Sequence, residues 1–208
     1  ERNKYQNCHQ VEKYNRFVNH SINTDFMAGK LNIYRNQKKS LSESLPIVGI
    51  NPGASYGEAK RWYPEEFAGV CVKLSGYYNI LIFGGPNEKD NATDIEKILI
   101  DKGVSNYQNL AGKTSISELV NHISNLDLFI TGDSGPMHLA ASFQVPTISI
   151  FGPTRNNETS QWMNDSSIIV KKNLDCQPCM KRACPLKHHD CMNLIKAADV
   201  LKAVKSLD

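Results

Sequence analysis

Four short apolar runs, with helical patterns between them, limit what this chain can fold into more than any other feature. Each run is rich in β-branched side chains, which is typical of strands that are buried on both faces of a sheet. The runs are residues 47–50, 79–83, 126–130 and 145–151, and a weaker fifth run is residues 167–170. Strands that alternate with helices in this way predict an α/β fold, a parallel sheet covered by helices.

Helical signals lie between and around these runs. A stripe of apolar side chains with the spacing of an amphipathic helix comprises Ile116, Leu119, Val120 and Ile123. Pro64, followed by two glutamates, suits the first turn of another helix. Helices are also predicted at residues 11–19 and 193–207. Residues 30–44 are polar and basic, which is typical of a linker.

Composition excludes several classes of protein. The chain has 208 residues, of which 40 % are apolar, so a sizeable core is possible. The net charge of +3 is too small to indicate a nucleic-acid partner. No apolar run approaches the roughly 18 residues of a membrane span, and no signal-peptide pattern opens the chain. Six cysteines are too few for a disulfide scaffold, which favours a reducing, cytoplasmic compartment. Because the first residue is Glu1, we expect a piece of a longer protein or a processed one.

The stretch TGDSGPMHLAA, residues 131–141, raises the question of a serine nucleophile. Trypsin-like proteases have a glycine where this chain has Pro136, and the α/β-hydrolase elbow needs Gly-x-Ser-x-Gly, so both patterns fail. A glycine-bearing turn between a strand and a helix start is instead suited to binding phosphate, because the first helical N–H groups are free. The alternative is that Asp133 and Ser134 only cap the helix, with Pro136 at its first position.

Two further glycine-bearing turns follow other predicted strands. The turn at residues 51–62 offers the Ser55 hydroxyl and the Lys60 charge to a phosphate, although Lys60 taken alone is better explained as an ordinary solvated lysine. In the turn at residues 84–88, Glu88 either binds ribose hydroxyls or begins a helix. Because the carboxyl ends of parallel strands share one edge of the sheet, three such turns predict a nucleotide-diphosphate site.

The two remaining motifs are a stretch that is similar to part of a P-loop and a cluster of cysteines. Residues 112–114, Gly-Lys-Thr, are not a P-loop, because Tyr107 stands where that pattern requires glycine. Four cysteines with the spacing C-x₂-C-x₄-C-x₆-C, together with two nearby histidines, could surround a tetrahedral Zn²⁺. They are Cys176, Cys179, Cys184, Cys191, His188 and His189. Reduced thiols without a metal and a redox disulfide are the other interpretations, and we expect no metal. The basic side chains of this segment either meet phosphates of an acceptor or are solvated.

Three stretches resemble ADP-heptose:lipopolysaccharide heptosyltransferases, glycosyltransferase family 9, and most resemble those members that add the second inner-core heptose. They read INPGASYGEAKRWYPEEFA, NLAGKTSISELVNHISNLDLFITGDSGPMHLAA and VPTISIFGPT. The resemblance covers residues 47 to about 200, and the cysteine-rich tail shares it. It implies a GT-B fold with two Rossmann-like domains. Residues 45–208 would be the carboxyl-terminal, donor-binding domain with a Cys-rich tail, and residues 1–44 the end of the amino-terminal domain and the linker.

The resemblance also implies roles for individual residues. Lys60 would neutralise the donor diphosphate and Asp133 would lie near the donor sugar, which makes these two the candidate catalytic residues. Backbone N–H groups of the turn formed by Ser134 and Gly135 would meet the diphosphate. The same donor-binding set includes Ser55, Met137 and His138. The implied reaction is inverting and uses no metal or cofactor, and most of the domain expected to supply the base is absent from this chain.

The expected partners follow from the same resemblance. The donor is ADP-heptose and the acceptor is of the lipid A–Kdo–heptose type, with no nucleic acid and with peripheral contact to the cytoplasmic face of the inner membrane. Two other functions stay open: a nucleotide-binding module without catalysis, and a zinc-stabilised module that binds polyanions. Binding of ADP separates the first two functions from the third, and transfer activity of the longer protein separates the first from the second.

Overall fold

The computed structural model describes residues 8–34 and 45–207 and contains a six-stranded, fully parallel sheet. The strands lie in the order β3-β2-β1-β4-β5-β6, which is the order of a Rossmann fold. Their bounds are β1 Ile47–Asn51, β2 Asn79–Ile82, β3 Tyr107–Asn109, β4 Leu128–Gly132, β5 Thr147–Phe151 and β6 Ser167–Lys171. The predicted α/β class with a parallel sheet is therefore confirmed.

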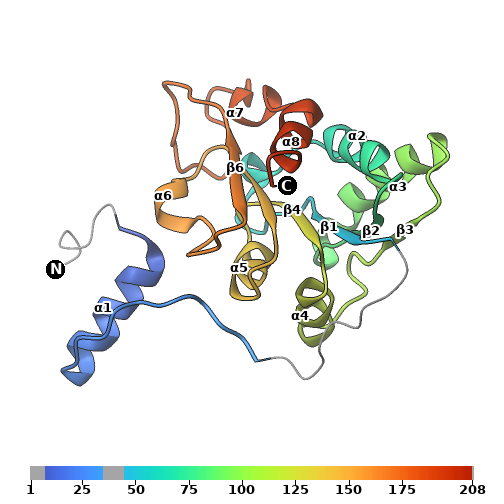
Figure 1. Cartoon of the computed structure of the whole chain (residues 1–208). Coiled ribbons are helices and arrows are strands. Elements are labelled where there is room, and N and C mark those ends of the chain that lie inside the picture. The colour runs from blue at the N-terminus through green and yellow to red at the C-terminus, as the bar shows by residue number, and fades with distance from the viewer. Residues whose placement is uncertain (1–7, 35–44, 208) are drawn as a thin grey trace.

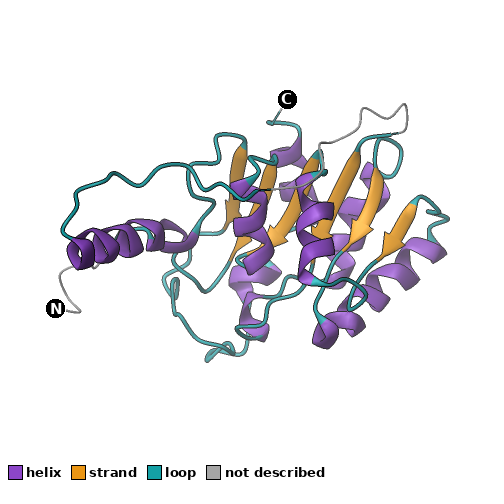
Figure 2. Ribbon diagram, turned by 90° about the horizontal axis from the view of Figure 1, so that it is seen from below, coloured by secondary structure: helices purple, strands orange, loops and turns teal. Residues whose placement is uncertain are grey.

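Helices cover both faces of this sheet (Figures 1 and 2). The α-helices are α1 Gln10–Ile22, α2 Pro64–Leu74, α3 Lys89–Asp101, α4 Ile116–Ser124, α5 Gly135–Ser142, α6 Asn156–Thr159, α7 Asp190–Asn193 and α8 Ala197–Val204. Two short 3-10 helices, η2 Glu58–Lys60 and η3 Pro86–Glu88, follow β1 and β2. No helix within the described ranges is both long and apolar enough to cross a bilayer.

Two apolar clusters hold the layers together. On one face, buried side chains of α2, α3 and α8 pack against alternate residues of the central strands, among them Val48, Ile50 and Ile130. On the other face, α4 and α5 pack against Phe83 and Phe129. Because consecutive strand residues point to opposite faces, the four stronger apolar runs supply both clusters, whereas Ile168 and Val170 of β6 pack against the first cluster alone.

Element bounds differ from the prediction in several places. The strand expected at residues 145–151 begins at Thr147, and the helix expected at residues 193–207 covers only Ala197–Val204. The strand expected at residues 126–130 begins only at Leu128, because the Leu126 N–H donates to the Ile123 carbonyl and so continues the end of α4. The edge strand β3 was not predicted, since its three residues, Tyr-Gln-Asn, carry no apolar run. Such a short edge strand is recognisable only from its pairing with β2.

Helix α1 lies apart from the sheet, beyond α6 in Figure 1. The helix predicted at residues 11–19 is thus confirmed and is longer, with His9 as its N-cap. Several contacts tie this region to the sheet domain. Among them, His9 Nε2 lies 2.9 Å from the Ser160 carbonyl, Lys13 pairs with Glu158 of α6 at 3.3 Å, and the Trp162 indole donates to the Gly29 carbonyl at 2.9 Å. In the predicted linker, residues 30–34 are irregular and Lys30 is paired with Asp165, whereas residues 35–44 lie outside the described residues.

Candidate nucleotide-binding site

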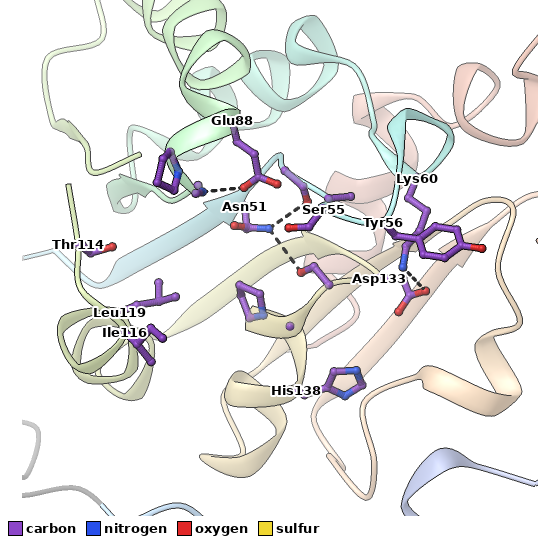
Figure 3. A pocket seen from close by; sticks show the side chains of 18 of the residues that line it. Asn51, Ser55, Tyr56, Lys60, Glu88, Thr114, Ile116, Leu119, Asp133 and His138 are labelled. Atoms are coloured by element: carbon purple, nitrogen blue, oxygen red, sulfur yellow. Dashed lines mark hydrogen bonds and ion pairs between the residues drawn. The ribbon is translucent and has the colours of Figure 1, made fainter. Parts of the chain in front are cut away.

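A cavity of about 470 Å³ lies at the carboxyl edge of the sheet, where β1 and β4 are neighbours and the strand order reverses. Open α/β sheets bind ligands at this switch point. The turns after β1, β2 and β4 all line the cavity, together with the start of α4 (Figure 3). The labelled lining residues are Asn51, Ser55, Tyr56, Lys60, Glu88, Thr114, Ile116, Leu119, Asp133 and His138. The structure therefore brings the three predicted turns together in one cavity.

The two candidate catalytic residues form an ion pair. Lys60 Nζ, from η2, lies 2.8 Å from an Asp133 carboxylate oxygen at the end of β4, and the two side chains are only 12 % and 8 % exposed. The same ammonium group lies 5.2 Å from the centre of the Tyr56 ring. The interpretation of Lys60 as a solvated surface lysine is thus wrong. Its charge is held inside the cavity, where low solvent access strengthens its attraction for an anionic ligand.

The start of α5 offers one backbone donor to the cavity, the Gly135 N–H, because Pro136 has no N–H and the Met137 N–H donates to the Ser134 carbonyl at 3.2 Å. Ser134 occupies the N-cap position but makes no capping bond, because its hydroxyl pairs with Thr131 Oγ1 at 3.0 Å and with Asn51 Nδ2 at 3.4 Å. A purely capping role for Ser134 is therefore wrong. Pro136 is the second residue of α5 rather than the first, and Gly135 is exposed with open space at its Cα. The partners of Ser134 are a hydroxyl and an amide, neither of which can act as the base that a nucleophilic serine needs.

Glu88, in the turn after β2, lines the cavity and lies against the turn after β1. Its side chain is buried, and its carboxylate accepts a hydrogen bond from the Gly85 N–H at 2.7 Å. Gly53 lies against the same carboxylate, so that a Cβ at that position would meet it at 2.0 Å. The residue also precedes α3, and both interpretations of it are therefore compatible: it stands at a helix start and still presents a carboxylate to the cavity.

Two of the other three predicted donor-binding residues line the cavity, and the third does not. His138 lies on the cavity side of α5, and burial lowers the pKa of its imidazole, with Asp133 opposing the shift and His9 and Lys60 adding to it. Ser55 is exposed and lines the cavity. Met137 is fully buried and is not among the lining residues, so its prediction as a donor-binding side chain needs correction. One residue along a helix turns the side chain by about 100°, which points Met137 into the core.

Sequence reasoning missed the wall formed by α4 and the loop before it. Thr114, Ser115, Ile116 and Leu119 line the cavity. Ile116 was counted as part of the apolar stripe that faces the core, yet it is 81 % exposed. Its position at the first residue of α4, next to a predicted binding edge, was the available signal. The Gly-Lys-Thr stretch at residues 112–114 is not a P-loop, but its threonine, Thr114, belongs to this wall of the cavity.

The four cysteines of the tail lie near one another without a metal-binding arrangement. Together with His188 and His189 they line a small cavity of about 20 Å³. Burial, followed by the neighbouring thiols, raises the pKa of Cys191 to about 11. Across residues 8–34 and 45–207, no group of three or more His, Cys, Asp or Glu side chains could hold a metal ion. The four tail residues are thiols and not disulfides.

A Rossmann-type sheet with such a cavity at its switch point is typical of nucleotide-binding α/β domains. The chain belongs to glycosyltransferase family 9, the heptosyltransferases, whose family model matches residues 2–189. The resemblance found in the sequence is thereby confirmed.

Two curated relatives and one solved structure show which members of the family this chain is similar to. Lipooligosaccharide heptosyltransferase 2 of Campylobacter jejuni serotype O:2 is 43 % identical over 219 residues, covering 100 % of this chain and 66 % of the relative. The serotype O:6 protein of the same name is 40 % identical over 212 residues, covering 100 % of this chain and 67 % of the relative. The structure of Escherichia coli ADP-heptose lipopolysaccharide heptosyltransferase II matches with a TM-score of 0.69 and 26 % identity, covering 81 % of this chain and 48 % of that chain. The chain thus spans about two thirds of the curated relatives and about half of the solved structure.

Proposed function

We propose that the cavity is the donor site of an inverting glycosyltransferase that moves heptose from ADP-heptose to the inner core of lipopolysaccharide or lipooligosaccharide. The observation that carries the proposal is the convergence of three strand-end turns on one cavity that holds the buried Lys60 charge. Membership of family 9 supports the reaction class. The names of the relatives from Campylobacter jejuni and Escherichia coli support ADP-heptose as donor and lipooligosaccharide or lipopolysaccharide as acceptor.

In this proposal each part of the donor meets chemistry suited to it. The diphosphate lies at the start of α5, where the Gly135 N–H and Lys60 compensate its charge. The Glu88 carboxylate accepts hydrogen bonds from the ribose hydroxyls. The exposed Ile116 gives adenine an apolar wall. Asp133, paired with Lys60, lies nearest to the sugar.

The proposed chemistry needs a base, an acceptor hydroxyl and a stabilised leaving group. The base removes the hydroxyl proton, the oxygen attacks the anomeric carbon from the face opposite ADP, and the bond to the diphosphate oxygen breaks. Negative charge then grows on ADP, where the Gly135 N–H at the start of α5 and the Lys60 ammonium stabilise it. One fixed donor of this kind contributes roughly 3 kcal/mol to lowering a barrier.

We further propose that residues 45–208 form the donor-binding domain and that residues 1–44 are the end of the amino-terminal domain and the linker. The separation of α1 from the sheet supports this division (Figure 1). So does a set of exposed apolar side chains on and after α1, since exposed apolar patches mark interaction surfaces. They are Tyr14, Phe17, Val18, Ile22, Phe26 and Met27. In this division the missing part of the relatives' length supplies the acceptor site and the base, and the reaction takes place in the cytoplasm at the inner-membrane face.

A transfer assay tests the proposal. Radiolabelled ADP-heptose and heptosyl-Kdo₂-lipid A are incubated with this chain and with the longer protein, beside a Lys97→Ala variant of the latter as control, because Lys97 is exposed and remote from the cavity. We expect turnover by the longer protein and its control variant and none by this chain. A longer protein that binds ADP but never transfers heptose would favour the non-catalytic module. Equal turnover by the short chain would show that the base lies within these residues and that the domain division is wrong.

A further inference from the structure

The turn that carries Lys60 is bound on its outer side by the Cys-rich segment, defined here as residues 176–191. Both backbone groups of Ala59, the residue before Lys60, are bonded to this segment. The Ala59 N–H donates to the Arg182 carbonyl at 3.0 Å, and His189 Nε2 lies 2.9 Å from the Ala59 carbonyl oxygen. A segment more than a hundred residues away in the chain thus fixes the peptide units on either side of Ala59.

The His189 ring is held at both nitrogens. Its Nδ1 lies 2.9 Å from the Tyr63 hydroxyl, which stands just before α2. A neutral ring with its proton on Nε2 donates to the Ala59 carbonyl and accepts from Tyr63, so one tautomer satisfies both contacts. His189 also has a left-handed backbone, with φ of 54°, which most side chains adopt only at a cost. The ring therefore connects Ala59, the middle residue of η2, to Tyr63, the residue before α2.

A second set of contacts reaches Lys60 through Tyr56. The Tyr56 hydroxyl donates to the Met180 carbonyl at 3.1 Å, and the Arg182 guanidinium lies 5.1 Å from the centre of the Tyr56 ring. That ring in turn lies 5.2 Å from Lys60 Nζ. Gly57 is so close to Arg182 that a Cβ there would lie 2.5 Å from the Arg182 carbonyl oxygen. Close backbone approach and ring contacts thus hold the whole turn against the Cys-rich segment.

We infer that the Cys-rich segment positions Lys60 for the donor diphosphate and that His189 is its principal positioning residue. A lysine has a long, flexible stem, so the placement of its charge depends on how firmly its backbone is held. In a reacting geometry, a misplacement of about 1 Å can lower the rate about 100-fold. The inference rests on the proposed function, because it requires that Lys60 bind the diphosphate.

The test compares ADP with AMP, which lacks the second phosphate. Calorimetry on this chain measures both affinities for the parent, for His189→Ala and for His188→Ala. The control is matched, because His188 belongs to the same segment but its Nδ1 bonds to the Asp190 N–H at 3.0 Å and not to the Lys60 turn. We expect His189→Ala to lower ADP affinity about 2- to 10-fold, the value of one hydrogen bond, and to leave AMP affinity unchanged. His188→Ala should change neither affinity.

Two further variants separate positioning from general damage. In the Lys60→Met background, which removes the charge, His189→Ala should cause no further loss of ADP affinity, since coupled residues are non-additive. His189→Gln should recover part of the loss, because its amide can donate to the Ala59 carbonyl. Equal losses for ADP and AMP in His189→Ala, or additive losses in the double variant, would overturn the inference.

The same measurements distinguish a failure of the proposed Lys60 role from a failure of the positioning inference. If Lys60→Met itself leaves the ratio of ADP to AMP affinity unchanged, the proposed role of Lys60 is wrong and the inference falls with it. If Lys60→Met lowers the ratio and His189→Ala does not, the role of Lys60 stands and the positioning inference alone is wrong.

Discussion

Replacing Lys60 by methionine should weaken ADP binding much more than AMP binding. The substitution removes the ammonium group and keeps most of the aliphatic stem that lies beside Tyr56. A hydrogen bond to a charged partner contributes about 1.5–3 kcal/mol, which corresponds to about a 10- to 150-fold change in dissociation constant. The low exposure of the Lys60 side chain, 12 %, places the effect within this range and not at the small values of surface charges.

Asp133 moves the expected loss towards the upper end of that range. Its carboxylate is 8 % exposed and has Lys60 as its ion-pair partner at 2.8 Å, so Lys60→Met leaves a buried negative charge facing the phosphates. Adding Asp133→Asn removes this charge. The double variant should therefore bind ADP more tightly than Lys60→Met alone, and its remaining loss, about 10-fold, measures the lysine itself.

Isothermal calorimetry with ADP and AMP measures these affinities. The matched control is Lys97→Met, because the Lys97 side chain is largely exposed and pairs with Asp94 of the same helix. The control should bind both nucleotides like the parent. Equal losses of ADP and AMP affinity in Lys60→Met would refute the diphosphate role, and so would no loss at all. A double variant that binds ADP no better than Lys60→Met would refute the repulsion assigned to Asp133.

Three further predictions concern single groups. Fluorophosphonate reagents should not label Ser134, whose hydroxyl is engaged by Thr131 and Asn51, and a labelled peptide containing Ser134 in mass spectrometry would overturn the binding-turn interpretation. Elemental analysis of protein purified without chelator should find far less than one zinc per chain, whereas near-stoichiometric zinc would reveal a site in the Cys-rich segment. Burial lowers the pKa of His138 in the folded chain. As pH falls below about 6.5, the unfolded chain therefore binds a proton at this residue before the folded chain does, and the free energy of unfolding should decline. His138→Gln should lessen that decline in urea unfolding at pH 7.5 and 5.5, and identical pH dependence in both proteins would contradict the shift.

Local sequence patterns were enough to predict the sheet and the edge at which the cavity lies. Strands buried on both faces need continuous apolar runs, and the runs at β1, β2, β4, β5 and β6 are all visible in the sequence. β3 is not, because its three residues are polar or half-buried and are recognised only by pairing with β2. The turns were predictable for the same reason as the strands: each directly follows a buried run.

Contacts between distant segments could not be predicted in this way. Lys60 and Asp133 were both named as candidates, but their ion pair depends on β1 and β4 being neighbours, which no local pattern specifies. Met137 and His138 are adjacent, and only the rotation of α5 decides that one enters the core and the other faces the cavity. The contact of His189 with the Lys60 turn joins parts of the chain 130 residues apart.

A crystal structure of this chain with ADP tests the central claim most directly, because it shows whether the three turns share one ligand. The account predicts the diphosphate at the start of α5, within hydrogen-bond distance of Lys60 Nζ and the Gly135 N–H, with the ribose at Glu88 and adenine against Ile116. ADP bound elsewhere would contradict it. The clearest such result would be ADP in the cavity of about 320 Å³ beside Arg155 and Lys171 at the ends of β5 and β6, with the Lys60 cavity unoccupied.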